Sequence, residues 1–289
     1  MIFPLRFSMI AFIKRLHQRL RRTRHAREAR PRLEALRPDI ERVCGGSVSF
    51  APTDGGGHDY VFYVKSEGRR TAVLRLANHQ YISAATPASY RINGPYCRLP
   101  PLARIAREHR ICQKGGELGI TPRPLWLSGD GEASMNAFVE GQRMLALAKT
   151  GAVGFWDALD RTAARAAQFH AVIGEAHMDL SLMNVIADAR EDRLVLIDFE
   201  LSPNPALTPD EAFLFDFLNL VEMAYKFMPL LDRQAADLRL DPFLSRYADP
   251  YRTADLSKMG SKLPRIFGDP VYREILARHF SSIPSPPRT

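Results

Sequence analysis

Cysteine is scarce in this chain of 289 residues, and a hydrophobic run long enough to span a bilayer is missing. The three cysteines, Cys44, Cys97 and Cys112, are odd in number and form no CxxC pair, so neither a zinc site nor a disulfide framework is indicated. The apolar start, MIFPLRFSMIAFI, is interrupted by Arg6 and is too short to cross a membrane. It also lacks the order of a signal peptide, because its charges follow the apolar residues. We therefore expect a cytoplasmic protein.

Positive charge is present in excess, but it is concentrated at one end. The net charge is +8, and residues 1–32 contain a single acidic residue, Glu28, against ten cations: Arg6, Lys14, Arg15, Arg19, Arg21, Arg22, Arg24, Arg27, Arg30 and Arg32. The rest of the chain is close to neutral, so its composition does not predict a nucleic-acid partner.

The same segment has helical periodicity. Ile10, Ile13, Leu16 and Leu20 recur at helical spacing among the cations, which is typical of an amphipathic helix on an anionic membrane surface. A solvated basic arm or an RNA-contacting tail is the alternative interpretation. We expect residues 1–45 to form a basic amphipathic segment that attaches the protein peripherally to a membrane through residues 1–32.

The most informative stretch is residues 177–199, HMDLSLMNVIADAREDRLVLIDF. Two short apolar runs separated by the polar DAREDR predict a β-hairpin. Asp179 and Asn184 precede the first run and Asp198 follows the second, so their side chains should converge. One carboxylate to orient a hydroxyl and accept its proton, with an Asn and an Asp to hold Mg²⁺, is the set that a kinase-type phosphotransferase needs. An ordinary hairpin with acidic residues at its turns is the simpler alternative.

Upstream of this stretch, residues 48–52, 60–64 and 71–76 predict three antiparallel strands. Gly55, Gly56 and Gly57 occupy the first turn, where adjacent glycines let backbone amides approach a triphosphate, although glycine-rich turns are also common without a ligand. Arg75 is the charge in the third strand, and we expect it to contact nucleotide phosphates. Arg in place of the usual Lys has a different reach.

A helix is expected from Pro101 to Gly115, since Pro suits the first turn and a glycine pair ends it. Glu108 lies on this helix and could pair with Arg75; a surface ion pair with Arg104 or Arg107 is the alternative. Farther along, MNAFVEG predicts a strand that ends in Glu140-Gly141, and we expect the backbone of Phe138, Val139 and Glu140 to hydrogen-bond adenine as a hinge.

Two more helices are predicted downstream. Residues 155–172 keep helical periodicity and lead to His177, while Thr208 and Glu211 form a capping box for a helix that follows. That second helix is apolar on nearly every face except at Asp216 and Asn219. A buried carboxylate needs hydrogen-bond donors, so we expect a structural role for Asp216, with a role in substrate binding as the alternative. In kinase folds a helix Asp of this kind accepts backbone N–H groups of the catalytic loop, here residues 177–184.

Between about residues 46 and 225 the chain resembles the protein-kinase-like superfamily, through VLRL, REHRICQKGGELGITP, FVEG, HMDLSLMN and LIDFE followed by FDFLNLVE. These motifs look like those of choline/ethanolamine kinases and aminoglycoside phosphotransferases. The short spacing from FVEG to HMDLSLMN is more similar to bacterial lipopolysaccharide core sugar kinases, including the Kdo kinases. Ser181, where protein kinases carry Lys, and the lack of an APE-like segment depart from the protein kinases proper.

The resemblance implies a two-lobed α+β fold: an N-lobe (46–141) with an antiparallel sheet and one helix, a mostly helical C-lobe (142–280), and a disordered tail (281–289). It implies ATP and Mg²⁺, with Asp179 as the catalytic residue, Asn184 and Asp198 as metal ligands, and Arg75 with Glu108 as a phosphate clamp. His177 would shape the loop without titrating.

Taken with the basic N-terminus, the resemblance predicts phosphorylation of a sugar hydroxyl in the lipopolysaccharide core, on a glycolipid acceptor at the cytoplasmic face of the inner membrane. Two alternatives remain. One is a soluble kinase for choline, an aminoglycoside or a related alcohol, and the other is a membrane-associated, catalytically silent regulator.

Overall fold

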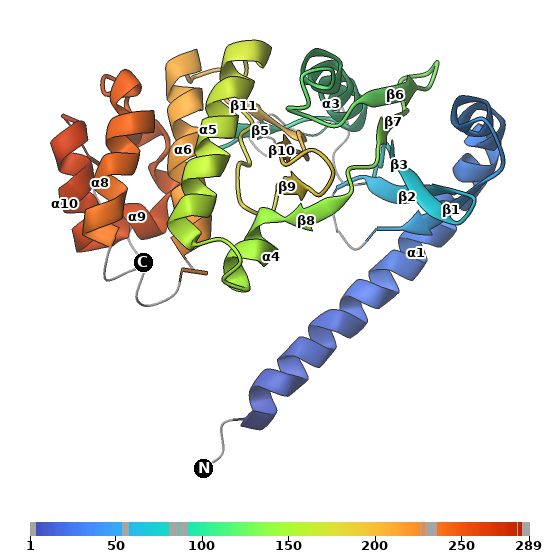
Figure 1. Ribbon diagram of the computed structural model, residues 1–289, viewed down its shortest axis with the longest axis horizontal. Coiled ribbons are helices and arrows are strands. Elements are labelled where there is room, and N and C mark those ends of the chain that lie inside the picture. The colour runs from blue at the N-terminus through green and yellow to red at the C-terminus, as the bar shows by residue number, and fades with distance from the viewer. Residues whose placement is uncertain are drawn as a thin grey trace. The chain divides into compact units, whose positions relative to one another are not determined.

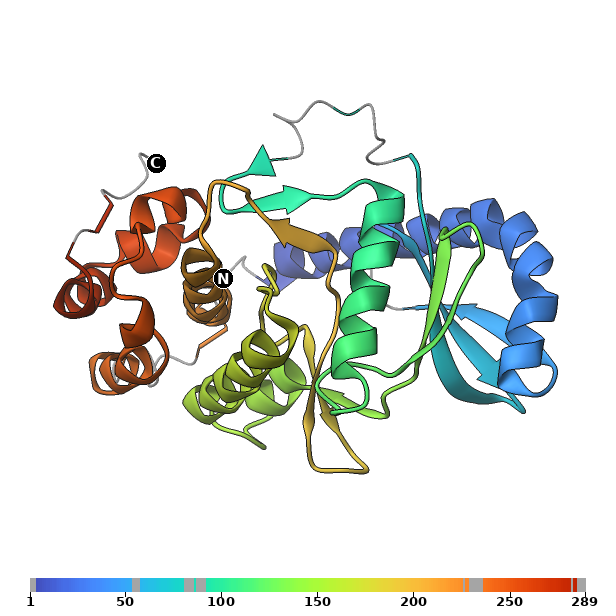
Figure 2. The same ribbon diagram turned by 90° about the horizontal axis from the view of Figure 1, so that it is seen from above.

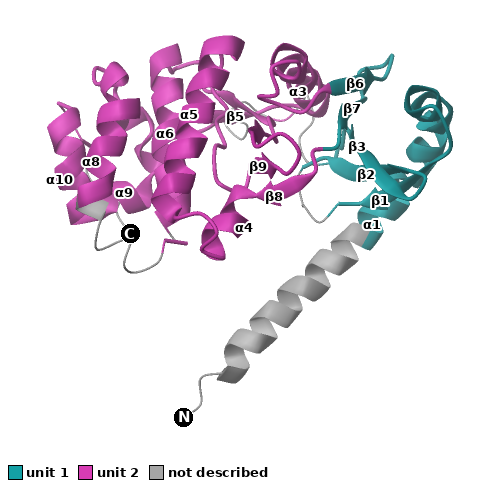
Figure 3. Ribbon diagram, viewed as in Figure 1, with its two compact units in different colours: residues 1–81, 124–138 teal, residues 82–123, 139–289 magenta. Residues whose placement is uncertain are grey.

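The computed structural model describes residues 4–53, 58–80, 86, 92–225, 227–228, 236–281 and 283–284, with side chains described for all of these except 4–22 and 236–237. The chain is α+β, with an antiparallel sheet in its N-terminal part and a largely helical C-terminal part (Figure 1). It divides into two compact units, unit 1 (residues 1–81 and 124–138) and unit 2 (residues 82–123 and 139–289) (Figure 3).

Unit 1 is built on a five-stranded sheet with the strand order β1-β2-β3-β7-β6. All neighbouring strands are antiparallel. Its elements are α1 (Pro4–Cys44), β1 (Val48–Pro52), β2 (Tyr60–Ser66), β3 (Arg69–Leu76), β6 (Pro124–Leu127) and β7 (Ala133–Ala137). The first three strands lie where the sequence predicts them, because the period-two alternation of apolar residues matches a sheet that buries one face.

The end of α1 nearest the sheet is part of the core of unit 1. Ala29, Leu33 and Ile40 are buried together with strand residues such as Phe62 and Leu74. Arg32 extends from the same helix and donates hydrogen bonds to the carbonyl of Ala77 (2.7 Å) and to Glu132 Oε2 (2.8 Å). Residues 29–40 therefore stabilise the sheet, which corrects the expectation that residues 1–45 form only an appendage.

Unit 2 is mostly helical and carries two small antiparallel sheets, β10-β9-β8 and β11-β5-β4. Its strands are β4 (Ile92–Asn93), β5 (Tyr96–Arg98), β8 (Gly141–Arg143), β9 (Val185–Asp188), β10 (Leu194–Leu196) and β11 (Leu201–Pro203). Its helices are α3 (Pro101–Gly115), α4 (Met144–Lys149), α5 (Phe155–Ile173), α6 (Pro209–Tyr225), α8 (Ala236–Tyr247), α9 (Pro264–Gly268) and α10 (Pro270–His279), with 3₁₀ turns at Asp249–Tyr251, Leu256–Lys258 and Gly260–Lys262.

The core of unit 2 lies around α5 and α6, which pack against each other. Fully buried aromatic side chains come from both helices: Phe169, Phe215 and Phe217. Helix α3 packs on α5, and α8, α9 and α10 extend the helical layer toward the C-terminus (Figures 1 and 2). Together these helices form the support on which the β9–β10 hairpin and its flanking loops rest.

The observed division differs from the predicted lobes at residues 82–123. The prediction places the helix at 101–115 in an N-lobe of residues 46–141, whereas the chain contacts group α3 with unit 2. The reason is visible in its packing, because α3 lies against α5, which belongs to unit 2. Most of the predicted tail at 281–289 lies outside the described residues.

Candidate active site

The segment that the sequence singles out folds as a loop, a hairpin and a second loop, all within unit 2. Helix α5 ends at Gly174, whose left-handed φ of 76° is readily adopted by glycine. The loop from His177 to Asn184 follows, and β9 then pairs with β10 in antiparallel register, Val185 opposite Leu196. Because of this register the amide of Ile197 donates to the carbonyl of Asn184 at 3.0 Å. Asn184 and Asp198 therefore reach the same open end of the hairpin, as predicted.

Asp179 is held against Asn184. The amide nitrogen Nδ2 of Asn184 donates to the main-chain carbonyl of Asp179 and to its carboxylate oxygen Oδ2, both at 2.9 Å. Burial first, and then the negative charge of Asp198, raise the pKa of Asp179 to about 7, although the hydrogen bond from Asn184 lowers it. A carboxyl group in this condition exchanges a proton near neutral pH.

Backbone strain marks the same two loops. Met178 has a φ of 67° and Asp198 a φ of 72°, conformations that side-chain-bearing residues rarely adopt. Met178 immediately precedes Asp179, and Asp198 is itself the second carboxylate of the predicted site. Strained residues of this kind persist where the surroundings hold them, and they concentrate at functional sites.

Asp216 supplies much of that restraint from inside α6. Its side chain is fully buried, and it accepts the amides of His177 (2.6 Å) and Met178 (2.7 Å), together with Nε2 of His170 (2.8 Å). The predicted role of Asp216 as an acceptor for the loop backbone is confirmed. His170, from α5, is a partner that sequence reasoning missed; its place in the last turn of the predicted helix at 155–172, which leads into the loop of His177, is the signal that could have found it.

His177 holds the two loops together through its ring. Nε2 donates to the carbonyl of Ile197 at 3.0 Å, and Nδ1 accepts the amide of Asp179 at 3.3 Å. The residue is fully buried, and burial lowers the pKa of its ring below the ordinary value. With one ring nitrogen donating and the other accepting, the imidazole is neutral, which agrees with the predicted structural role.

In unit 1, Arg75 lies near the end of β3 and is largely buried. Its Nη1 lies 3.6 Å from Oδ2 of Asp59, whose other oxygen accepts the amide of Asn78 at 3.1 Å. Sequence reasoning missed Asp59 as a partner, although its place just before β2 puts it beside the end of β3 in a hairpin of this register. Glu108 belongs to unit 2 and is buried, as are Arg104 and Arg107 on the same helix, and its charge acts on Arg107. Its pairing with Arg75 stays a prediction, as does the alternative pairing with Arg104 or Arg107.

The predicted nucleotide-binding turn at Gly55, Gly56 and Gly57 lies outside the described residues. Of the predicted hinge, Phe138 donates its amide to the carbonyl of Thr71 (3.0 Å), and the carbonyl of Glu140 accepts the amide of Ala189 (2.9 Å). Those two groups are engaged within the chain, which restricts the predicted adenine contacts to the remaining backbone groups of Phe138, Val139 and Glu140.

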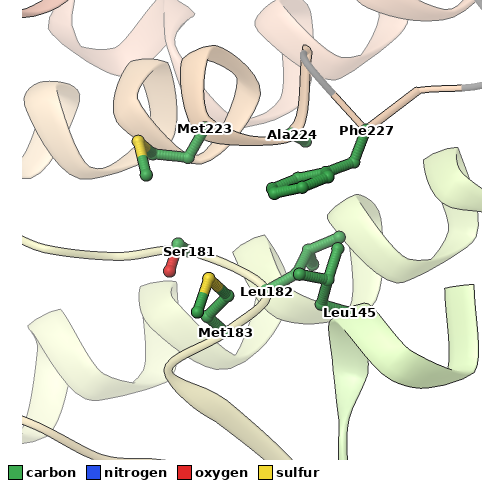
Figure 4. A pocket seen from close by; sticks show the side chains of 7 residues that line it. All are labelled: Leu145, Ser181, Leu182, Met183, Met223, Ala224 and Phe227. Atoms are coloured by element: carbon green, nitrogen blue, oxygen red, sulfur yellow. The ribbon is translucent and has the colours of Figure 1, made fainter. Parts of the chain in front are cut away.

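A small, mainly apolar pocket lies beside the loop that carries Asp179. The side chains of Ser181 and Met183 lie on one side of it, and those of Met223 and Phe227 lie on the other (Figure 4). Ser181, its only hydroxyl, is two residues from Asp179. The lining residues are Leu145, Ser181, Leu182, Met183, Met223, Ala224 and Phe227.

The residues present fit a magnesium ion held jointly with phosphates better than a metal held by protein alone. Among the residues that the structure describes, no group of three or more His, Cys, Asp and Glu side chains could hold a metal ion. Mg²⁺ in phosphotransferases takes one or two protein ligands and completes its shell with phosphate and water. Asn184 donates through Nδ2 to Asp179, and its Oδ1 with the carboxylate of Asp198 makes such a two-ligand set.

Comparison with protein-family models and with curated proteins gives no match. In the part of the chain that the structure describes, no helix is both long and apolar enough to cross a membrane.

Proposed function

We propose that the protein is an ATP- and Mg²⁺-dependent phosphotransferase with an alcohol as acceptor, built on a two-lobed protein-kinase-like fold. The observation that carries the proposal is the grouping of Asp179, Asn184 and Asp198 at one end of the β9–β10 hairpin, with Asn184 bonded to Asp179 and the charge of Asp198 raising its pKa. An ordinary hairpin turn would not need this buried support from His177 and Asp216.

In this proposal Asp179 orients the acceptor hydroxyl and accepts its proton. A base acts most effectively when its pKa lies near the working pH, and the pKa of about 7 satisfies that condition. The bond from Asn184 restrains the carboxylate so that one oxygen is held and the other can face the hydroxyl. The strained backbone at Met178 and Asp198 belongs to the same restraint.

Asn184 and Asp198 would hold Mg²⁺ on the nucleotide phosphates. The metal ion supplies positive charge that offsets the charge developing on the transferred phosphoryl group. The nucleotide phosphates are assigned to Arg75 and to the turn at Gly55, Gly56 and Gly57. Adenine is assigned to the backbone of Phe138–Glu140. Glu108 is assigned as a second partner of Arg75. Asp59 supports Arg75 within unit 1 in any case.

The acceptor that we propose is a sugar hydroxyl of a membrane-borne glycolipid, most specifically the lipopolysaccharide core at the cytoplasmic face of the inner membrane. Two features support it: the resemblance in motif spacing to core sugar kinases, and the six cations within residues 1–22, each worth roughly 1 kcal/mol near an anionic leaflet.

The test is phosphate transfer from labelled ATP to bacterial lipid extracts and, side by side, to soluble sugars, choline and aminoglycosides. Asp179→Asn and Asp198→Asn should each reduce transfer by several orders of magnitude, because they remove the base and a metal ligand. Asp192→Asn, in the exposed β9–β10 turn, is the matched control and should keep full activity.

Transfer to a soluble alcohol alone would favour the small-molecule kinase, and lack of any transfer by the wild type would favour the catalytically silent regulator. Wild-type turnover in Asp179→Asn would remove the assignment of the base.

A further inference from the structure

Arg107, on α3, is a buried cation that the proposed chemistry leaves without a role. It is 5% exposed, and two of its guanidinium nitrogens donate to main-chain carbonyls: Nη1 to Phe199 at 2.7 Å and Nη2 to Ala176 at 2.7 Å. Its Nε lies 3.6 Å from Oε2 of Glu175. All of these groups lie within unit 2.

The two carbonyls bracket the candidate active site along the chain. Ala176 immediately precedes His177 at the start of the loop that carries Asp179, and Phe199 immediately follows Asp198. One planar guanidinium therefore joins the beginning and the end of the segment that contains the three predicted active residues. A rigid fork of donors suits this task, because both bonds are set by one group.

The peptide between Ala176 and His177 is held from both sides. Its carbonyl accepts from Arg107, and its N–H donates to the carboxylate of Asp216 at 2.6 Å. A buried cation and a buried anion thus share one peptide unit, so each offsets the charge of the other. Burial lowers the pKa of Arg107 to about 10, while the charges of Glu175 and Asp216 raise it, so the guanidinium stays charged at neutral pH.

We propose that Arg107 is a positioning residue that holds the loops carrying Asp179 and Asp198 in register, acting through the carbonyls of Ala176 and Phe199. The catalytic consequence rests on the proposed phosphotransferase function. The restraint on the loops does not, because it follows from the hydrogen bonds alone. Helix α3 would in this way be coupled to the geometry of the active site.

The experiment compares Arg107→Lys and Arg107→Met with Arg110→Met in the whole protein. Arg110 lies one turn along α3, is more exposed, and pairs with the same Glu175, so its loss removes a cation without touching either carbonyl. Lys at position 107 keeps the charge but lacks the planar fork whose two nitrogens each bond one carbonyl. This variant still tests the proposal if Arg107→Met does not fold. Two quantities are measured for each variant. The first is the amide hydrogen exchange of residues 176–180 and 197–200, and the second is kcat with saturating ATP and Mg²⁺.

In Arg107→Lys we expect amide exchange in those two stretches to accelerate at least about tenfold, with little change in α10. We expect kcat to fall on the order of tenfold to hundredfold, because small misplacements of reacting groups have effects of that size. KM for ATP should change little, and Arg110→Met should match the wild type in all three measurements.

Three results would overturn the proposal. Exchange in the 176–180 and 197–200 stretches could stay unchanged in the Arg107 variants, or it could rise equally throughout unit 2. Arg110→Met could also show the same rise as the Arg107 variants. Local loosening with an unaltered kcat would also overturn it, because the residue would then not position the active groups. If the wild type transfers no phosphate, the proposed function fails, and the exchange data alone still decide whether Arg107 holds the segment.

Discussion

Asp179 combines two properties that are in conflict at the scale of a single residue. A carboxylate that accepts a proton must be accessible to its substrate, yet burial and the nearby charge of Asp198 disfavour its ionised form. The hydrogen bond from Asn184 offsets part of this cost. A residue that works against the stability of the fold in this way is expected at an active site, where function rather than packing decides the choice of side chain.

The raised pKa of Asp179 makes a prediction about stability. In the unfolded chain the group titrates near its ordinary value of 3.8, and in the folded protein near 7, so between these pH values the folded state binds the extra proton. The free energy of unfolding therefore falls as pH rises from about 4 to about 7, and the loss persists above 7.

Asp179→Asn removes the cost of ionising this buried carboxyl group. The variant should therefore be about as stable as the wild type at pH 4 and more stable at pH 8. Urea unfolding at both pH values measures the difference. Asp192→Asn, in the exposed turn, should show no pH-dependent gain. A constant difference between Asp179→Asn and the wild type across this range would contradict the raised pKa.

Buried carboxylates on α6 organise the neighbouring elements. Asp216 holds the loop of the candidate active site, and Glu222, two turns later, serves the short helix α9. Glu222 Oε2 accepts the amides of Arg265 and Ile266 at 3.0 Å each, and Oε1 accepts the guanidinium of Arg265 at 2.7 Å. These amides belong to the first turn of α9, where no intrahelical acceptor exists. The side chain of Glu222 therefore caps α9, a helix about forty residues farther along the sequence.

Glu222→Ala should destabilise the protein by about 3 kcal/mol, because it leaves the buried amide of Ile266 and the partly buried amide of Arg265 without an acceptor and removes a charge-assisted bond. Glu274→Ala on α10 is the control: its carboxylate pairs with Arg278 on the surface and should contribute less than about 1 kcal/mol. Chemical denaturation of both variants gives the comparison. Equal losses would mean that the cap on α9 does not contribute to global unfolding.

At the scale of the whole molecule, the N-terminal helix contributes its later residues to the fold, and we propose that its earlier residues attach the protein to a membrane. Residues 29–40 belong to the core of unit 1, and Glu28 accepts the hydroxyl of Tyr60 at 3.1 Å. The cations and the Ile10–Leu20 stripe that predict membrane attachment come earlier in the sequence. The sheet is contacted by the helix from His25 onward, where the His25 ring packs edge-on against Tyr60, so the proposed attachment is assigned to the residues before His25 rather than to all of residues 1–32.

Removing residues 1–22 should abolish binding to anionic vesicles and leave thermal unfolding unchanged. Removing residues 1–32 should in addition cost about 2–4 kcal/mol, because it exposes the site of Ala29 and deletes the bonds of Arg32. Vesicle co-sedimentation and unfolding midpoints separate the two effects.

The control for this comparison is Ile13→Asp with Leu16→Asp in the full chain, which reverses the apolar stripe and keeps every cation. It should lose vesicle binding at unchanged stability, whereas a tail that binds only through its charges would retain it. Vesicle binding by the protein that lacks residues 1–22 would refute the membrane-anchor hypothesis.

Local patterns in the sequence determined most of the elements and the part of the site that is contiguous in the chain. Period-two and helical spacing predict β1, β2, β3, α3, α5 and α6, and the capping box at Thr208 and Glu211 is present as predicted, with both reciprocal bonds. The β9–β10 hairpin brings Asn184 and Asp198 to one end for the same reason: hairpin register follows from neighbouring residues.

Only the tertiary structure decided which distant groups serve that segment. Arg107 and His170 acquire their roles from the way α3 and α5 pack, and the grouping of α3 with unit 2 has the same origin. A buried polar side chain must find a partner, but sequence spacing does not say which of many distant backbone groups will supply it.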